Sequence, residues 1–205
     1  MEKQKIISVE LARWYDENDK ENSVNINTYL NYVESENKQA IANFILNRFH
    51  SRYLKPFLYV GNSEFKRLYK NGFSIMANCC LLIETLESFK KGWKNTIGRS
   101  ERAFEDFFKS EPQFAMFKGF EKSFYKNVRC GILHQGESTG GWRIRRAGKV
   151  FDTETFEINS VLFAEVLLMT LKSYSTKLEQ SDWNSEIWVN FRKKMNTIIE
   201  NCRPE

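Results

Sequence analysis

The chain has 205 residues, of which 41% are hydrophobic, 15% aromatic and 28% charged, and its net charge is +5. These values allow a sizeable core and fall within the range of a single domain. The mean hydropathy of −0.53 excludes a membrane protein, because the longest uncharged apolar stretch, from Phe73 to Ile83, is too short to span a bilayer. Three prolines and ten glycines forbid helices at few positions, so the composition favours an all-α class.

The first residues and the cysteines bear on the compartment of the protein. The first ten residues carry four charged side chains and no apolar run, so they do not resemble a secretory signal and we expect a cytoplasmic protein. The cysteines form no Cys-x-x-Cys pair, which predicts reduced, structural thiols at Cys79, Cys80, Cys130 and Cys202.

The N-terminal quarter of the chain shows helical spacing of apolar residues. Residues 1 to 23 predict a docked helix followed by a polar loop that starts at Asp16, and the apolar residues of this helix are Ile7, Leu11, Trp14 and Tyr15. Residues 27 to 54 then predict either one long helix or two, ended by Pro56.

Three further helices are predicted before Gly136. Residues 73 to 89 are strongly apolar and should form the central helix, and residues 101 to 109 form a short one. The third follows Pro112 and stops at Gly136. Its apolar stripe has steps of three and four residues and consists of Phe117, Phe120, Phe124, Val128 and Ile132.

The remaining third of the chain changes character and then returns to helix. Residues 137 to 158 predict a Gly-rich insertion, with a small β-hairpin around residues 141 to 157 and a turn at Ala147-Gly148. Asn159 should cap a helix from Ser160 to about residue 178, and Asp182 or Asn184 a last one. The expected fold is therefore all-α: one helical domain over residues 1 to 205 with a hairpin insertion.

Few residues are suited to acid or base chemistry near neutral pH. The chain has two histidines, His50 and His134, and it shows neither a phosphate-binding glycine loop nor a set of zinc ligands, so we expect no metal and no cofactor. His50 is interpreted as a structural or surface residue. His134 has more informative neighbours.

The stretch from Phe124 to Gly136 reads FYKNVRCGILHQG, in which four residues separate Arg129 from His134. With this motif late in a helix of an all-α chain, the sequence resembles the HEPN superfamily over about residues 28 to 180. The resemblance implies an HEPN-like helical bundle, cleavage of RNA without a metal, and a composite site at a homodimer interface in which Arg129 and His134 are catalytic. A protein antitoxin or regulator is a further partner that the sequence does not identify.

The chain departs from the family pattern at two positions. Many members have Asn or Asp after the arginine, where this chain has Cys130, a weak hydrogen-bonding group. Asn127, Gln135 or Thr139 could supply a polar contact instead. Gly136 stands where one toxin branch has Tyr, so the chain is not assigned to that branch.

The spacing of Arg129 and His134 is itself a geometric constraint. Five positions on an α-helix turn through about 500°, which leaves the two side chains about 140° apart around the axis. We therefore expect a two-fold dimer to bring the helices together, with Gly131 permitting close approach of their backbones. The alternative is that Arg129 is a solvated charge and His134 a last-turn residue favoured by the helix dipole.

Basic residues on both sides of His134 suggest an anionic ligand. Lys118, Lys122 and Lys126 should share one helix face with Arg129. A second cluster on the expected hairpin comprises Arg143, Arg145, Arg146 and Lys149, with Trp142 available to stack on a base. These residues predict RNA binding, and the alternative is an edge strand protected by charge.

Glu84 is unusual because it lies on the apolar side of the central helix. A buried carboxylate needs a partner. Arg129 is a candidate, in which case Glu84 would orient its guanidinium; the alternative is a partly exposed Glu84 at the rim of the core.

These observations lead to one preferred function and two alternatives. We expect a metal-independent endoribonuclease that acts as a homodimer, with His134 as base or acid and Arg129 stabilising charge on the phosphate. Its products would carry a 2′,3′-cyclic phosphate and a 5′-hydroxyl. The alternatives are a non-catalytic module that binds RNA, a nucleotide or a protein partner, and a helical interaction protein with no role in nucleic-acid binding.

Overall fold

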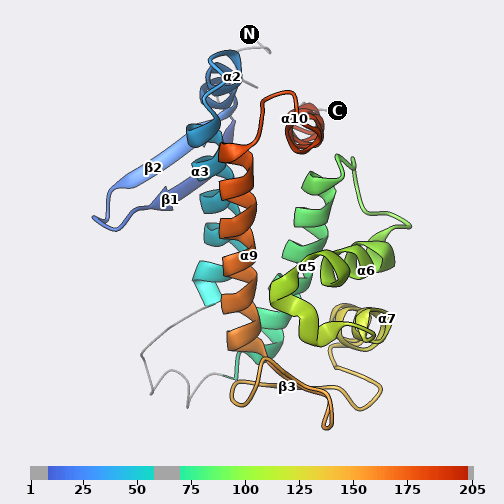
Figure 1. The fold of residues 1–205 in the computed structure, drawn as a ribbon. Helices are drawn as coiled ribbons and strands as arrows, with labels where there is room; N and C mark the ends of the chain where they lie inside the picture. Colours follow the sequence, from blue (N-terminus) through green and yellow to red (C-terminus); the bar gives the residue numbers. More distant parts are fainter. Residues whose placement is uncertain (1–8, 58–69, 203–205) are drawn as a thin grey trace. The chain divides into compact units, whose positions relative to one another are not determined.

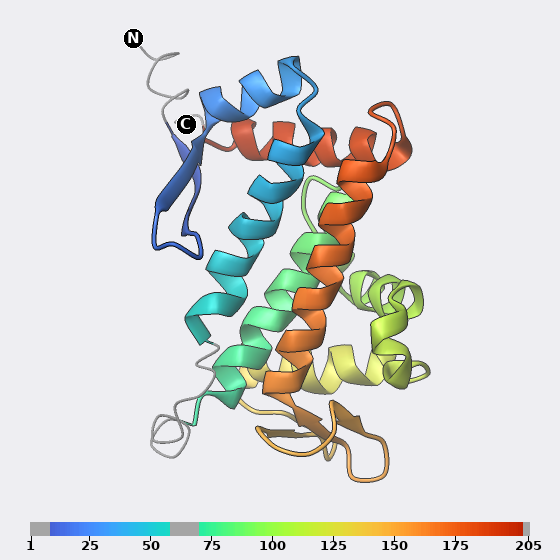
Figure 2. The same ribbon diagram turned by 60° about the vertical axis from the view of Figure 1, so that its left-hand side comes forward.

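The computed structural model describes residues 9–57 and 70–202 (Figures 1 and 2). This part of the chain is mostly helical and carries two small sheets, so the expectation of a helical fold is confirmed in its coarse form. It divides into two compact units. The first unit contains the described residues up to Arg52, Ser88–Asn95, and the residues from Leu171 onward; the second contains those within Tyr53–Glu87 and Thr96–Thr170. Among the helices so described, none is long and apolar enough to cross a membrane.

The first unit begins with a β-hairpin where a helix was predicted. Strands β1 (Glu10–Tyr15) and β2 (Glu21–Asn25) pair antiparallel. The turn between them is held by Asp16, whose Oδ1 accepts hydrogen bonds from the backbone amides of Asn18 and Lys20 at 2.9 and 3.1 Å. This turn chemistry outweighs the helical spacing of the apolar residues. The prediction was wrong for residues 10–15, and Ile7 lies outside the described residues.

Two helices follow the hairpin, which resolves the choice between one helix and two. Helix α2 (Ile26–Glu34) and helix α3 (Lys38–Phe49) are separated because Asn37 caps α3, its side chain accepting a hydrogen bond from the Ala40 amide at 3.0 Å. A π-helical turn η1 (His50–Leu54) and a 3₁₀ turn η2 (Lys55–Phe57) come next. His50 is the half-buried first residue of η1.

Helix α10 (Glu186–Glu200) completes the first unit and runs crosswise to α3 in Figure 2. The C-terminal part of α9 (Ser160–Gln180) also belongs to this unit, where the Ser175 hydroxyl donates to the Ala42 carbonyl at 2.9 Å. The core of the unit is aromatic, with Phe89 in contact with both Phe49 and Phe191.

The second unit contains most of α5 (Gly72–Lys90), helix α6 (Ser100–Ser110) and a chain of short helical segments. These segments are the 3₁₀ turn η3 (Pro112–Phe117), α7 (Glu121–Phe124), the π-helical turn η4 (Tyr125–Arg129) and α8 (Cys130–Gln135). One straight helix was predicted after Pro112. The chain breaks instead at Gly119, which has φ +87°, and widens in η4. Gly136 ends α8 with φ +73°, as predicted.

A three-stranded sheet replaces the hairpin predicted around residues 141 to 157. Strand β5 (Glu157–Asn159) lies between β3 (Arg143–Arg145) and β4 (Phe151–Asp152). It pairs parallel with β3 and antiparallel with β4, so the hairpin of this sheet is β4–β5. Asn159 then caps α9 as predicted, accepting from the amides of Val161 and Leu162.

The loop after α8 generates the first testable prediction. Gly140 and Gly141 both have positive φ, at +60° and +82°, so alanine at either position should cost about 1 to 2 kcal/mol. A Cβ at Gly140 would in addition lie 2.5 Å from Oδ1 of Asn127, whereas a Cβ at Gly141 would have nothing within 4 Å. In urea unfolding, Gly140→Ala should therefore lose at least about 1 kcal/mol more than its neighbour Gly141→Ala. Equal losses would contradict the contact with Asn127.

Candidate functional site

Arg129 and His134 meet within one chain. Arg129 ends the π-helical turn η4 and His134 lies in the last turn of α8, with Nη1 of the arginine 3.2 Å from Nε2 of the histidine. The expectation that one straight helix cannot make a compact site from these two positions does not apply here, because η4 is a π-helical turn and the long arginine side chain reaches across the angular separation. The geometric reason for requiring a dimer disappears with it.

The buried carboxylate of Glu84 holds the other edge of the guanidinium. Nε of Arg129 donates to Oε1 of Glu84 at 2.7 Å, and the two side chains are 15% and 9% exposed. This confirms the predicted pairing. Burial is the largest single influence on the pKa of Arg129 and lowers it, but the charge of Glu84, together with hydrogen bonding to Glu84 and Cys130, raises the pKa overall. With one edge on Glu84 and an Nη on His134, the guanidinium has a fixed orientation.

Two hydroxyl groups complete the surroundings of Glu84. Its second oxygen, Oε2, accepts hydrogen bonds from Thr96 Oγ1 at 3.0 Å and from Ser100 Oγ at 2.9 Å. Both carboxylate oxygens are thus satisfied, as a buried charge requires. Neither hydroxyl could be predicted from the sequence, because nothing in the pattern of residues links Thr96, which precedes α6, or Ser100, at its start, to Glu84 in α5.

Tyr125 and Cys130 lie on the outer side of the arginine. The guanidinium carbon of Arg129 is 5.6 Å from the centroid of the Tyr125 ring, a cation–π distance. Burial, followed by hydrogen bonding to the Cys130 thiol, raises the pKa of the Tyr125 hydroxyl. Cys130, the residue after the motif arginine, therefore acts on the ionisation of Tyr125. The spacing of Tyr125 four residues before Arg129 was the available sequence signal for this neighbour.

The other polar residues considered as replacements do not serve the pair. The Asn127 amide donates to the Ser123 carbonyl at 3.0 Å, and its oxygen accepts from the Thr139 hydroxyl at 3.0 Å. These bonds tie the loop after α8 back to η4. Gln135 is exposed at the end of α8.

Gly131 permits a close backbone approach within the chain, and not between two chains as predicted. It is buried, and a Cβ at this position would lie 2.4 Å from the carbonyl oxygen of Glu137. The Glu137 amide in turn donates to the Gly131 carbonyl at 3.3 Å. The space facing Gly131 is filled by the loop of the same chain, so it does not serve the predicted approach of a second helix.

The predicted basic helix face is not formed as a unit. Lys118 precedes Gly119 and lies outside the helical segments, Lys122 is 3.7 Å from Glu105, and Lys126 is exposed. Arg129 turns toward Glu84. On a regular helix these side chains would share one face. The break at Gly119 and the widened turn η4 rotate the residues that follow them, so the side chains point in different directions.

Three residues of the second basic cluster, Arg143, Arg145 and Lys149, are exposed but partly neutralised, whereas Arg146 is half-buried. Arg143 and Arg145 both contact Oε1 of Glu157, at 3.2 and 3.3 Å. Lys149 lies 3.8 Å from Asp152. Ion pairs this exposed contribute little to the free energy of folding, and they leave the cationic side chains accessible to a polyanion.

Trp142 is not available for stacking on a base. Its ring is 2% exposed and stacks on Phe151 with centroids 4.9 Å apart, while its Nε1 donates to Ser123 Oγ at 3.1 Å. Its position next to the arginines suggested an exposed ring, but the ring is packed in the aromatic core beneath the sheet.

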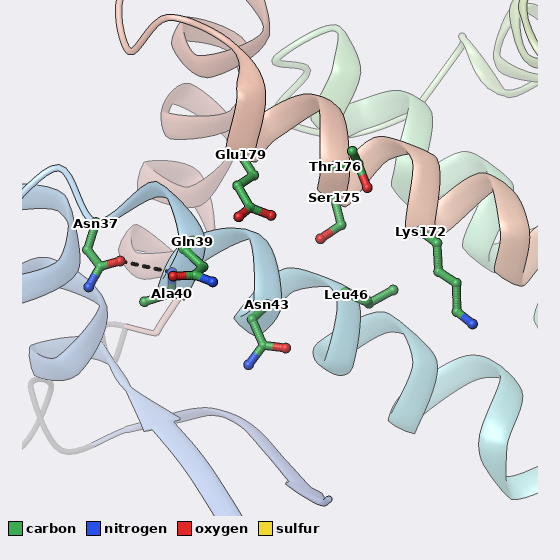
Figure 3. A pocket seen from close by; sticks show the side chains of 9 residues that line it. All are labelled: Asn37, Gln39, Ala40, Asn43, Leu46, Lys172, Ser175, Thr176 and Glu179. Atoms are coloured by element: carbon green, nitrogen blue, oxygen red, sulfur yellow. Dashed lines mark hydrogen bonds between the residues drawn. The ribbon is translucent and has the colours of Figure 1, made fainter.

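A polar groove of 670 Å³ lies between α3 and the C-terminal part of α9 in the first unit (Figure 3). It is lined by Asn37, Gln39, Ala40, Asn43, Leu46, Lys172, Ser175, Thr176 and Glu179. Asn37 and Ser175 are already engaged with the backbone of α3.

Neither a family model, nor a curated protein, nor a solved structure matches the chain. In the part of the chain that the structure describes, no three His, Cys, Asp or Glu side chains come together as a metal site would require.

The buried pair generates the second prediction. Arg129→Ala leaves the Glu84 carboxylate without its cation and should cost about 3 to 5 kcal/mol in the free energy of unfolding. Adding Glu84→Gln to that variant should recover part of the loss, with a coupling energy of about 0.5 to 3 kcal/mol in a double-mutant cycle. Arg102→Ala serves as the control, since the Arg102 side chain is 73% exposed and lies 3.6 Å from the half-buried Asp106. Its cost should stay below about 1 kcal/mol. Additive effects at positions 84 and 129 would contradict the ion pair.

Proposed function

We propose that the protein is a metal-independent endoribonuclease of HEPN type. The observation that carries this proposal is the contact between Arg129 Nη1 and His134 Nε2 at 3.2 Å, with the guanidinium held on its other edge by Glu84. A cation and an acid-base group side by side are what phosphodiester cleavage by the adjacent 2′-hydroxyl needs. The HEPN resemblance, which rests on the same two residues, points the same way.

The hydrogen bond between the pair assigns a role to each nitrogen. A guanidinium can only donate, so Nε2 of His134 is the acceptor and the neutral imidazole carries its proton on Nδ1. When a phosphate enters, the arginine donates to its oxygens, and Nε2 is released to accept the proton of the ribose 2′-hydroxyl. The 2′-oxygen then attacks phosphorus, the bond to the 5′-oxygen breaks, and that oxygen takes up a proton from water while His134 returns its own proton to water. The products are a 2′,3′-cyclic phosphate and a 5′-hydroxyl.

Exposure and charge support access of RNA to the pair. His134 is exposed at the end of α8, where a phosphodiester can reach it. The accessible cations Lys122, Lys126, Arg143 and Arg145 supply phosphate contacts. A homodimer through residues 117–135 remains part of the proposal, as the resemblance implies, but each Arg129 acts with the His134 of its own chain.

The third prediction tests cleavage. Wild type should cut RNA in EDTA, and His134→Asn should lower the rate by about 10² to 10⁴, the usual range for acid-base catalysis. Because His134 is exposed, this variant should keep its melting temperature. His50→Asn, which alters the only other histidine of the chain, is the matched control and should cleave as wild type does. RNA with 2′-deoxy sugars should remain intact.

A folded wild type that binds RNA and never cuts it would contradict the enzyme and favour a binding module. One observation favours that second candidate: Nε2 of His134 is already engaged by Arg129. Cleavage that survives in His134→Asn would also contradict the assignment.

The fourth prediction concerns the dimer. Arg129→Lys keeps the positive charge but loses the fork that reaches Glu84 and His134 together, so it should be inactive. If the pair acts within one chain, mixing this variant with His134→Asn should restore no activity. Restoration toward a quarter or more of the wild-type rate would show instead that arginine and histidine of different chains combine.

A further inference from the structure

The polar groove between α3 and α9 has a fixed register. Lys38 Nζ donates to the Ser181 carbonyl at 3.0 Å, and Ser175 Oγ donates to the Ala42 carbonyl at 2.9 Å. Since the later residue of α3 pairs with the earlier residue of α9, the two helices run antiparallel. All residues that line the groove belong to the first unit, whereas the proposed cleavage site belongs to the second.

The two ends of the groove carry opposite charges. Glu179 lies at the end where Gln39 begins the wall of α3, and Lys172 lies at the other end, near Leu46 (Figure 3). Glu179 follows Lys172 by seven positions, which is about 10 Å along α9 at 1.5 Å per residue. Seven positions are close to two full turns, so both side chains leave the helix on the same side.

Several side chains along the groove have hydrogen-bonding capacity left over. Within residues 9–57 and 70–202, neither an ion pair nor a hydrogen bond engages the side chains of Gln39, Lys172, Thr176 and Glu179. Oδ1 of Asn43 accepts from Asn47 at 2.8 Å, which leaves the amide nitrogen of Asn43 able to donate. Lys38 does not neutralise the acidic end, because its ammonium is directed to the Ser181 carbonyl.

A short peptide matches this set of groups. Each peptide unit presents one N–H donor and one C=O acceptor, and a carboxamide such as that of Gln39 both donates and accepts. The free ends of a peptide add an ammonium group for Glu179 and a carboxylate for Lys172. At about 3.3 Å per residue, three extended residues span about 10 Å, the separation of the two charged positions.

We propose that the groove binds a free tripeptide in extended conformation, with its amino group at Glu179 and its carboxylate at Lys172. The groove volume of 670 Å³ falls within the range of about 300 to 1,000 Å³ for small-molecule sites. Neither the HEPN resemblance nor the proposed cleavage uses this groove, so the proposal goes beyond the ribonuclease.

Other ligand classes fit the lining less well. The lining holds one cation and one carboxylate, so it carries no net charge and does not attract a polyanion such as RNA. A neutral oligosaccharide could bond to the amides and to the Thr176 hydroxyl, but it would leave both charges without partners. A zwitterion of the right length satisfies the two charges and the polar groups between them.

NMR titration of the ¹⁵N-labelled full chain with trialanine tests the proposal. Trialanine should bind with a Kd of about 1 mM or tighter and shift the side-chain amide signals of Gln39 and Asn43. These signals are identified by their loss in Gln39→Ala and Asn43→Ala. N-acetyl-trialanine lacks the positive end and trialanine amide lacks the negative end, so each should bind about three- to fivefold more weakly, as expected for exposed ion pairs.

Two variants test the orientation of the peptide. Glu179→Gln should bind trialanine and its N-acetyl form equally, and Lys172→Met should bind trialanine and its amide equally, because each variant removes the partner of one end. Both side chains are exposed, so the melting temperature should not change. Lys177→Met is the matched control, since Lys177 is an exposed residue of α9 outside the groove, and it should keep both preferences.

The proposal is overturned if about 10 mM trialanine leaves the Gln39 and Asn43 signals unchanged. It is also overturned if maltotriose, a neutral chain of similar length, binds as tightly, because hydrogen bonding without charge would then account for the affinity. A loss in Lys177→Met equal to that in Lys172→Met would exclude a localised basic end. His134→Asn should bind trialanine as wild type does, so this proposal and the ribonuclease can fail separately.

Discussion

The candidate site depends on the cost of burying one carboxylate. Glu84 is 7% exposed in the middle of α5, where an ionised group is tolerated only if both oxygens find partners. Arg129 supplies the charge, and Thr96 and Ser100 supply hydroxyl donors. Three segments of the second unit are thereby joined at one point: the middle of α5, the start of α6 and the junction of η4 with α8. The direction of the Arg129 guanidinium, and hence its contact with His134, follows from this arrangement.

The aromatic core of the second unit explains why the segment from Pro112 to Gln135 does not form one regular helix. Phe108, Phe117, Phe124 and Phe163 are all buried against one another. The chain reaches these positions by a 3₁₀ turn, a break at Gly119 and a π-helical turn, and each irregularity rotates the residues that follow. The lysines consequently do not share a face with Arg129. The same core takes up Trp142, because a large ring with a hydrogen-bonded Nε1 is more stable there than in water.

The two proposals differ in what supports them. The ribonuclease proposal rests on a pair of side chains with complementary chemistry and on a resemblance carried by the same pair. The peptide groove rests on opposite charges and amide groups that two antiparallel helices bring together, with no motif behind them. The pair belongs to the second unit and the groove to the first, so neither proposal depends on the other.

The sequence by itself determined the helical character of the chain, several of its helix boundaries and the pairing of Glu84 with Arg129. Asn159 and Gly136 could be recognised as helix ends because capping depends on local hydrogen bonds and on the conformational freedom of glycine. Glu84 stood out as a charge on an apolar face, and Arg129 as its partner, because a buried carboxylate cannot be left alone. The tertiary structure alone decided the N-terminal hairpin, the strand order β3-β5-β4 and the groove between α3 and α9. Each of these depends on residues far apart in the sequence, or on a turn that overrides helical spacing. Periodicity along one segment predicts which of its residues face the core, whereas contacts between segments decide which residues they pack against.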